Sequence, residues 1–420
     1  MTNFLWPGDH RAGDLMTDQA LLRSMVAVES AWLNALAITG IAPGECADVD
    51  LWPLIEAQDC EALAASAEDS GGPVVGLVTV LRARAAPSIA RWIHRGLTSQ
   101  DVIDTGLMLA TRAVLVQLKS ALAEQISTLA TLVATHRSTP MVARTLTQHA
   151  LPTTFGAKAA GWLSGIVVAY QRLNSLGMPV QIGGAAGTLA ATTELAILRD
   201  IEGIPAEISA HLVQTVASTL DLDTASPWHT TRTPVTAAAD AFLTCTDAWG
   251  RIASNVVTLA RPEIGELSEP ATGPRGGSST LPDKHNPVLS ILIRRTAIAA
   301  PPLASTLHTA AALANDERPD GAWHAEWDTL RILARRTVVA GRQCGELLGG
   351  LEVHSVRMAE NLSASDVLGE QRVMATVAGK PPSPTYLGAV DILIDEVLDR
   401  AQRILNEDSC EVPRMLRNRP

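Results

Sequence analysis

The segment 276–287 concentrates side chains that can hold an anion and move a proton. It reads Gly-Gly-Ser-Ser-Thr-Leu-Pro-Asp-Lys-His-Asn-Pro and lies between two apolar stretches. Its glycines allow the backbone to approach a ligand closely, and its two prolines prevent a simple continuation of either flanking helix. A glycine-rich surface turn has a similar composition, so both interpretations stay open on this segment alone. The candidate residues are Ser278, Ser279, Lys284 and Asn286.

A second polar stretch, residues 92–105, precedes an apolar segment with helical periodicity and contains His94, Thr98 and Ser99. Serine and threonine before a helix are ordinary N-caps. The same helix end also gathers free N–H groups, which bind carboxylates. These residues are therefore either helix caps or ligands of an anionic substrate.

A third polar stretch, residues 141–155, breaks the helical period and brings Gln148 and His149 together. A lone histidine is more often a satisfied structural residue than a catalyst. The sequence Trp-His-Thr-Thr-Arg, which ends at Arg232, stands just before another long helix-like segment. Arginine can bind a carboxylate through two parallel hydrogen bonds, so Arg232 is also a candidate ligand.

Three further segments favour plainer interpretations. The glycine run 183–187 could suggest a phosphate cradle, but no strand–helix crossover pattern surrounds it. Glu263, Glu266 and Glu269 form an acidic run that we interpret as a solvated face. Residues 316–327 are predicted to form a polar turn that holds two tryptophans.

The elements that must position these residues are long helices. Their predicted length of about 25 residues is well above the usual 11–12, and corresponds to nearly 40 Å. Because these segments are apolar on more than one face, we expect them to be buried between subunits. No alternation of apolar and polar residues gives a convincing strand. The predicted long helices are 107–137, 156–177, 235–260, 288–314 and 326–348.

The composition of the chain restricts its possible partners, metal sites and location. The chain has 420 residues, 47% apolar and 18% charged, with a formal net charge of −11, which argues against a nucleic-acid partner. Its five cysteines are widely spaced and include no CxxC, which favours a reducing compartment and no zinc site. We see neither a signal peptide nor an uninterrupted apolar run of about 18 residues, so we expect a cytoplasmic protein without a membrane partner.

Together the polar blocks resemble the fumarase/aspartase superfamily. Its hallmark, Gly-Ser-Ser-x-Met-Pro-x-Lys-x-Asn-Pro, matches residues 277–287, with Leu281 at the methionine position. The pattern His-x-Gly-x-Thr-Ser-x-Asp-x-x-Asp-Thr of its adenylosuccinate lyase-like branch matches residues 94–105 completely. Arg144-Thr145 and Pro-Thr-Thr-Phe-Gly at 152–156 match a third block. The resemblance covers roughly residues 1–350.

The resemblance implies an all-α, three-domain fold whose central long-helix bundle assembles into the twenty-helix core of a homotetramer. Active sites of this superfamily are shared by three subunits. The expected division of this chain is an N-terminal helical domain at 1–105, the central bundle at 106–349 and a short C-terminal helical domain at 350–420.

Two apolar residues distinguish this chain from most carbon–nitrogen lyases of the superfamily. Those enzymes carry a histidine after the Arg-Thr pair and a glutamate seven residues after the loop lysine. Here the two positions are Leu146 and Ile291. If only the histidine were replaced, the glutamate would stay buried without a partner, which is costly. Replacement of both residues by apolar ones is therefore the pattern expected where this proton relay has been lost.

The chain instead resembles the cycloisomerase branch, which closes 3-carboxy-cis,cis-muconate to a lactone in protocatechuate breakdown. That branch shares the Gln148-His149 pair, Pro-Trp-His-Thr at 227–230, Glu317-Arg318 and Trp-His-Ala-Glu-Trp at 323–327. Two loop residues depart from it, because Asp283 and His285 stand where the branch usually has histidine and arginine. Both changes lower the positive charge expected to hold a tricarboxylate.

By this resemblance, Ser278 transfers the carbon proton, Lys284 stabilises its alkoxide, and His149 orients the substrate or assists the lactone oxygen. A small polycarboxylate would be held by His94, Thr98, Ser99, Gln148, Arg232, Ser279, Asn286 and Arg318. No metal or organic cofactor is expected, because no redox step occurs. The alternatives are a superfamily lyase that releases an amine, nitrite or similar group from a substituted succinate to give fumarate, and a non-catalytic helical tetramer.

Overall fold

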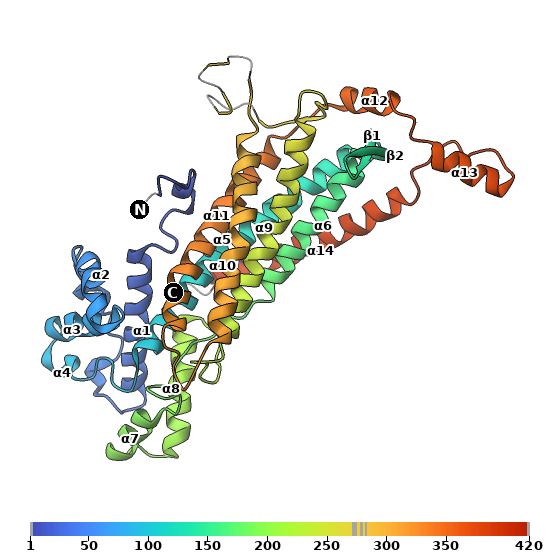
Figure 1. The fold of residues 1–420 in the computed structure, drawn as a ribbon. Helices are drawn as coiled ribbons and strands as arrows, with labels where there is room; N and C mark the ends of the chain where they lie inside the picture. Colours follow the sequence, from blue (N-terminus) through green and yellow to red (C-terminus); the bar gives the residue numbers. More distant parts are fainter. Residues whose placement is uncertain (1–2, 271–274, 278–279, 282–283, 418–420) are drawn as a thin grey trace.

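The computed structural model describes residues 3–270, 275–277, 280–281 and 284–417. Long antiparallel helices form an elongated bundle, with a helical cap at one end and an arm at the other (Figure 1). This mostly helical architecture and its long central helices confirm the all-α prediction. The central helices are α5 (Ser99–Thr135), α6 (Phe155–Asn174), α9 (Thr233–Leu259), α10 (Val288–Ala312) and α11 (Ala322–Gly349).

Two of these helices begin earlier than the apolar pattern predicts. Helix α5 starts at Ser99, because the Asp101 carboxylate accepts the Thr98 N–H at 2.9 Å in half of a capping box. Helix α11 starts at Ala322, so Trp323 and Trp327 are helical and the predicted polar turn over 316–327 is wrong in its second half. In both cases, polar residues that resemble a turn form the first helical turn.

The N-terminal cap is a separate apolar cluster. Thr17 caps α1, since its hydroxyl accepts the Ala20 N–H at 3.2 Å. Further along the chain, a short 3-10 turn precedes α2. Two helices that the pattern did not predict, α7 and α8, bury Ala196 and Leu212 in this cluster. The cap comprises α1 (Asp18–Ile38), α2 (Asp59–Ser70), α3 (Val74–Arg84), α4 (Pro87–Ala90), α7 (Ala190–Leu198) and α8 (Pro205–Leu220), with 3-10 turns at Asp9–Ala12, Gly44–Cys46 and Trp52–Leu54.

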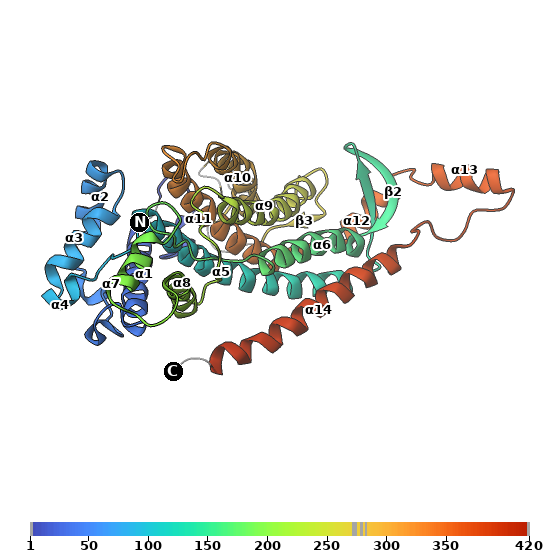
Figure 2. The same cartoon turned by 90° about the horizontal axis from the view of Figure 1, so that it is seen from below.

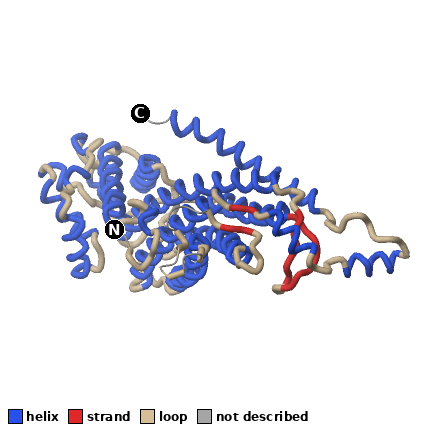
Figure 3. The backbone as a smooth tube through the Cα atoms, turned by 90° about the horizontal axis from the view of Figure 1, so that it is seen from above, coloured by secondary structure: helices blue, strands red, loops and turns tan. Residues whose placement is uncertain are grey.

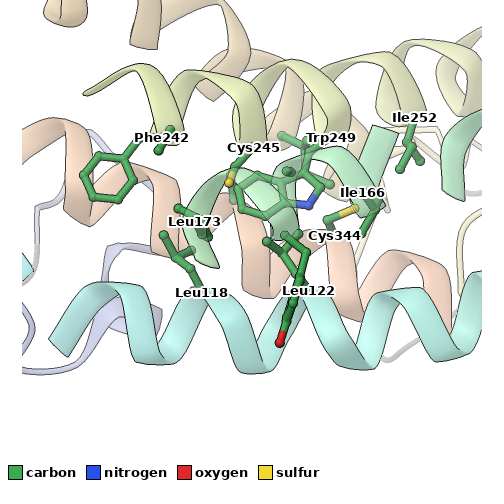
Figure 4. Packing of buried hydrophobic residues seen from close by; sticks show 14 of the residues in the cluster. Leu118, Leu122, Ile166, Leu173, Phe242, Cys245, Trp249, Ile252 and Cys344 are labelled. Carbon is green, nitrogen blue, oxygen red and sulfur yellow. The ribbon is translucent and has the colours of Figure 1, made fainter. Parts of the chain in front are cut away.

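The central bundle has one continuous apolar core (Figure 4). Trp249 of α9 is completely buried at its centre, and its indole N–H donates to Oε1 of Gln125 at 2.8 Å. Gln125 in turn donates to the Gly341 carbonyl at 2.8 Å, so one polar side chain links α5, α9 and α11. Cys245 and Cys344 are buried there as free thiols, and burial raises the pKa of each.

The described residues form two small antiparallel sheets, so the expectation of no strand is wrong for residues 140–154. Strands β1 (Pro140–Thr145) and β2 (Gln148–Thr154) form a hairpin at the far end of the bundle (Figure 3). An irregular register between Val142 and Arg144 interrupts the pairing and hides the period of two that would reveal strands. The second sheet pairs β3 (Leu267–Ser268) with β4 (Glu352–Val353).

The C-terminal segment makes an arm and then returns. Helices α12 (Ser355–Ser363) and α13 (Gly369–Ala378) lead away from the bundle, and α14 (Val390–Arg417) runs back along α5 and α6 (Figure 2). Ile394, Ala401 and Ile404 of α14 are buried in the central core. Arg137 fixes the start of this helix through Asp391 at 2.7 Å and Asp395 at 2.6 Å.

Helices α1, α5 and α10 are long and apolar enough, by length and composition alone, to cross a membrane. In the folded chain, half or more of the relevant window of α1 and α5 is buried, but only 33% of that of α10. Helix α10 therefore presents a larger apolar surface than packing within one chain explains.

Candidate functional site

The predicted residues lie in three groups, the first at the start of α5. This α5-start cluster consists of His94, Thr98, Ser99 and Arg318, all partly buried. Nη2 of Arg318 donates to the Thr98 hydroxyl and, at 3.4 Å, to the Ala185 carbonyl. A guanidinium beside the N-terminus of a 37-residue helix gives this corner two sources of positive potential. The arrangement suits a carboxylate ligand.

Asp101 holds the glycine run against this cluster. Its completely buried carboxylate accepts the N–H groups of Gly183 at 2.9 Å and Gly184 at 3.0 Å. These are the donors that a phosphate cradle would need, so the glycine run is structural here. A Cβ on Gly183 would lie 2.6 Å from Cε1 of His229, which requires glycine at that close approach.

Arg232 has a structural role in this fold that its sequence position did not predict. Its completely buried guanidinium donates to Asp104 at 2.7 and 3.1 Å and to Glu326 at 2.6, 3.0 and 3.2 Å. Burial alone would lower the pKa of Arg232, but the two carboxylates outweigh it and the net shift is upward. A guanidinium saturated by two carboxylates has no open edge for a third.

The second group lies on the β1–β2 hairpin. Gln148 and His149 are exposed, and Nδ1 of His149 lies 2.5 Å from Oγ of Ser365 beyond α12. The two residues at the hairpin tip, Leu146 and Thr147, adopt left-handed backbone angles with φ of 46° and 74°. Leucine and threonine are unusual in such a turn, and Leu146 is 96% exposed. An apolar residue held out in this way suggests a contact outside the chain.

The acidic run is buried more deeply than predicted. Glu263 is exposed, but Glu266 is completely buried and accepts two hydrogen bonds from Arg144, at 2.9 and 2.7 Å. The Glu269 carboxylate accepts the N–H groups of Leu289 at 2.9 Å and Ser290 at 2.6 Å. Two of the three glutamates are therefore structural, and the expected solvated face is wrong for them.

The third group is the segment 275–287. Ser278, Ser279 and Asp283 lie outside the described residues. Lys284 is exposed, whereas the backbone N–H and side-chain amide of Asn286 both donate to the Gly276 carbonyl, at 2.8 and 3.1 Å. This bridge closes the base of the segment at the point where Glu269 caps α10. Gly276 has φ of 80° and a Cβ there would lie 2.6 Å from the Asn286 carbonyl, so the closure requires glycine.

The fold separates the first group from the other two. Helix α5 has 37 residues, which places the α5-start cluster about 55 Å from the hairpin at its other end. Helix α10 has 25 residues, which places Lys284 about 37 Å from the turn that carries Arg318 (Figure 1). One chain therefore does not bring the predicted catalytic and binding residues together. A cavity of about 580 Å³ beneath Trp327 is lined by none of them.

The sequence motifs missed several residues that shape these groups. Asp101 lies inside a recognised motif, but its bonds to the glycine run join segments 82 residues apart. Glu29, on α1, lies in an apolar helical pattern, and its 2.6 Å contact with Nδ1 of His94 spans 65 residues. A charged residue on an otherwise apolar helix face was the available signal.

Comparisons with known proteins identify the family of this chain. A family model described as lyase matches residues 53–300. A nitrosuccinate lyase from Streptomyces davaonensis is 43% identical over 376 residues, covering 86% of this chain and 76% of the relative. The chain belongs to the fumarase/aspartase superfamily. A 3-carboxy-cis,cis-muconate cycloisomerase from Bradyrhizobium diazoefficiens is 38% identical, covering 83% and 76% of the two chains.

Solved structures of the superfamily share the fold. The crystal structure of 3-carboxy-cis,cis-muconate lactonizing enzyme from Pseudomonas putida superimposes with a TM-score of 0.80 and 30% identity, covering 94% of this chain and 97% of that one. A fumarate lyase from Mesorhizobium sp. BNC1 gives a TM-score of 0.78 and 26% identity, covering 92% and 97%. This chain is therefore an enzyme of the lyase superfamily, similar both to a nitrosuccinate lyase and to cycloisomerases.

Proposed function

We propose that this enzyme eliminates an anionic leaving group from a substituted succinate, and that nitrosuccinate is its leading substrate. The pair Leu146 and Ile291, which stand where other members have a proton relay, supports an anionic leaving group, and the 43% identity to a nitrosuccinate lyase favours nitrite as that group. Leu146 is 96% exposed at a hairpin tip and Ile291 is 48% exposed on α10. Neither side chain can donate a proton to a departing amine. Nitrite is a weak base that departs as an anion and needs no such donor.

The chemistry breaks two bonds and forms one double bond. A base takes the proton from the carbon beside one carboxylate, the electron pair forms the carbon–carbon double bond, and nitrite leaves with the electrons of the carbon–nitrogen bond. The products are fumarate and nitrite. Ser278 is the proposed base, with Lys284 stabilising its alkoxide. The α5-start cluster would hold a substrate carboxylate, where the helix N-terminus and Arg318 offer positive potential.

We further propose that three chains of a homotetramer complete each site. The separation of about 55 Å between the two ends of α5 supports this, because no substrate of succinate size spans it. Exposed apolar residues on the central helices also support it, since burial between subunits would remove them from water. They include Val116, Val168, Ile291 and Ile298. A cytoplasmic location stays a prediction from the sequence.

Closure of 3-carboxy-cis,cis-muconate to a lactone is the second candidate. In the reverse, ring-opening direction, the carboxylate leaves the ring carbon as an anion and needs no proton donor. The missing relay is therefore compatible with both reactions. The cycloisomerase identity of 38% and the shared Gln148-His149 pair favour it. Against it stand the 43% identity to a nitrosuccinate lyase and the loop residues Asp283 and His285, which reduce the positive charge available to a tricarboxylate.

The test is a parallel assay of purified protein whose oligomeric state has been measured. Nitrosuccinate, 3-carboxymuconate and a panel of amino-substituted succinates would each be incubated at equal concentration. We expect fumarate and nitrite in equal amounts from the first substrate. Loss of diene absorbance without nitrite release would select the lactone reaction. Release of an amine, or no turnover by an intact oligomer, would overturn the proposal.

A further inference from the structure

Glu29 forms a carboxylate–imidazole pair with His94 of the α5-start cluster. Oε1 of Glu29 lies 2.6 Å from Nδ1 of His94. The Glu29 side chain is completely buried, whereas the His94 side chain is 18% exposed. Within the part of the chain that the structure describes, Oε2 of Glu29 has no hydrogen-bond partner. Among the described residues, the imidazole is therefore the hydrogen-bond partner of this carboxylate.

The backbone around His94 is held from two other helices. Trp32, one turn after Glu29 on α1, donates its indole N–H to the Arg95 carbonyl at 2.7 Å. Arg82 of α3 donates to the Ile93 carbonyl at 2.7 Å. His94 itself has φ of 60°, in the left-handed region that a side chain rarely adopts. The turn is thus fixed on both sides of the histidine, and Glu29 fixes the ring.

A purely structural role explains this pair poorly. Arg82 of α3 also interacts electrostatically with this carboxylate. Burying a carboxylate is still costly, and an apolar residue of similar size would fill the space on α1 without that cost. In the described residues, Nε2 of His94 makes no hydrogen bond. A carboxylate on one ring nitrogen sets the tautomer and the orientation of the other, which is a common arrangement around functional histidines.

We propose that Glu29 is a positioning residue, which accepts a hydrogen bond from Nδ1–H of His94 and orients the ring so that Nε2–H of the doubly protonated ring donates to a substrate carboxylate at the start of α5. This rests on the proposed function, in which the α5-start cluster binds the substrate. When the ring carries both protons, Nε2–H donates to the substrate and the Glu29 carboxylate balances the ring charge. Because the charges of the ring and the carboxylate cancel, the pair offers the substrate a directed hydrogen bond without a net positive charge. Arg318 and Lys284 each offer a positive charge.

A spectroscopic test is independent of the reaction. Solid-state ¹⁵N spectra of histidine-labelled protein would be recorded for the wild type, Glu29→Gln and His94→Asn, the last to assign the His94 signals. We expect a hydrogen-bonded, protonated Nδ1 in the wild type, and a displaced Nδ1 signal or a second tautomer in Glu29→Gln. Trp32→Phe is the matched control, because it removes only the bond to the Arg95 carbonyl. Unchanged His94 signals in Glu29→Gln would overturn the proposal.

A double-mutant cycle tests how the pair acts on substrate. We expect Glu29→Gln to raise KM roughly tenfold with a smaller change in kcat, as loss of a supporting hydrogen bond typically does. The same change in a His94→Asn background should have almost no further effect. Equal effects in both backgrounds would show that Glu29 acts on the fold. If Glu29→Gln does not fold, Glu29→Asp keeps the charge and should show a smaller KM change.

The two levels of failure can be distinguished. If the wild type turns over neither nitrosuccinate nor 3-carboxymuconate, the proposed function fails, while the spectra still decide whether Glu29 sets the His94 tautomer. If turnover is found but the spectra and the cycle show no coupling, only the positioning role fails.

Discussion

Nη1 of Arg232 lies 2.7 Å from Oδ2 of Asp104, and both side chains are completely buried. Glu326 of α11 closes the other side of the guanidinium at 2.6 Å. Burial raises the pKa of Glu326, while Arg232 partly opposes that shift. This triad fixes the start of α9 to α5 and α11.

Replacing Arg232 with methionine should destabilise the fold by about 3–5 kcal/mol, because two buried carboxylates lose their counter-charge. Melting temperatures compared at one protein concentration would measure the loss, since assembly contributes to stability. Arg331→Met is the control, because its pair with Asp18 is partly exposed and worth less than about 1 kcal/mol. Normal stability with a raised KM would restore Arg232 as a substrate ligand.

Glu269→Ala should reduce activity more than it reduces stability. Glu269 caps α10, whose own N-cap residue, Pro287, makes no side-chain cap hydrogen bond. Loss of a cap costs about 1 kcal/mol. The same change releases the end of the segment that carries Lys284 and Asn286, so we expect kcat to fall at least about tenfold. Glu269→Gln, which retains an acceptor oxygen, should be milder, and equal loss in both variants would contradict the capping role.

Lys158 makes the stability depend on pH. Its burial lowers the pKa of the ammonium group below the 10.5 of an exposed lysine, and the charge of Arg144 adds to the shift. The unfolded chain therefore binds this proton more tightly than the folded chain. The free-energy cost of burying the protonated Lys158 lowers stability in full below the folded-state pKa. Stability should rise as pH increases from that folded-state value towards 10.5.

Lys158→Met should accordingly raise stability near neutral pH by about 1 kcal/mol and flatten the alkaline rise. Unfolding would be followed by circular dichroism across the pH range, with Lys380→Met as an exposed control. A variant that keeps the full alkaline rise would show that Lys158 is not its source.

Ser278→Ala should be inactive while the oligomer and its melting temperature are retained. His149→Ala should likewise be impaired, and mixed assemblies of the two variants should regain activity. In a randomly mixed tetramer, the subunit that supplies Ser278 to a site carries the intact serine with a chance of one half. The subunit that supplies His149 is intact with the same chance, so about a quarter of the sites are complete and activity should reach about a quarter of wild type. Size exclusion and an activity assay after co-refolding would measure this. No recovery in verified mixed oligomers would place both residues in one subunit's site.

The long helices could be predicted because apolar residues repeat along α6, α9 and α10 at helical spacing. The hairpin could not, since its register irregularity removes the alternation that marks strands. The roles of Glu266 and Glu269 were hidden for a different reason. Their partners, Arg144 and the N-terminus of α10, lie far along the chain, and charge alone favours solvent.

In the candidate site, too, features encoded within a short segment could be predicted, whereas contacts between distant segments could not. Motifs identified Thr98, His149 and Lys284, because spacing within a short segment carries that information. The placement of these residues at opposite ends of the bundle follows from the lengths of α5 and α10 and from their antiparallel packing. The same motif spacing could not reveal that Arg232 is saturated by Asp104 and Glu326, since those contacts cross between helices.

Helix α5 joins the α5-start cluster to the hairpin as one uninterrupted rod. A single inserted or deleted residue within it would turn one end by about 100° relative to the other and shift it by about 1.5 Å. Gly106 would then lose its close fit against Met25, and the hairpin would point in a new direction. The length of α5 should therefore stay constant during divergence.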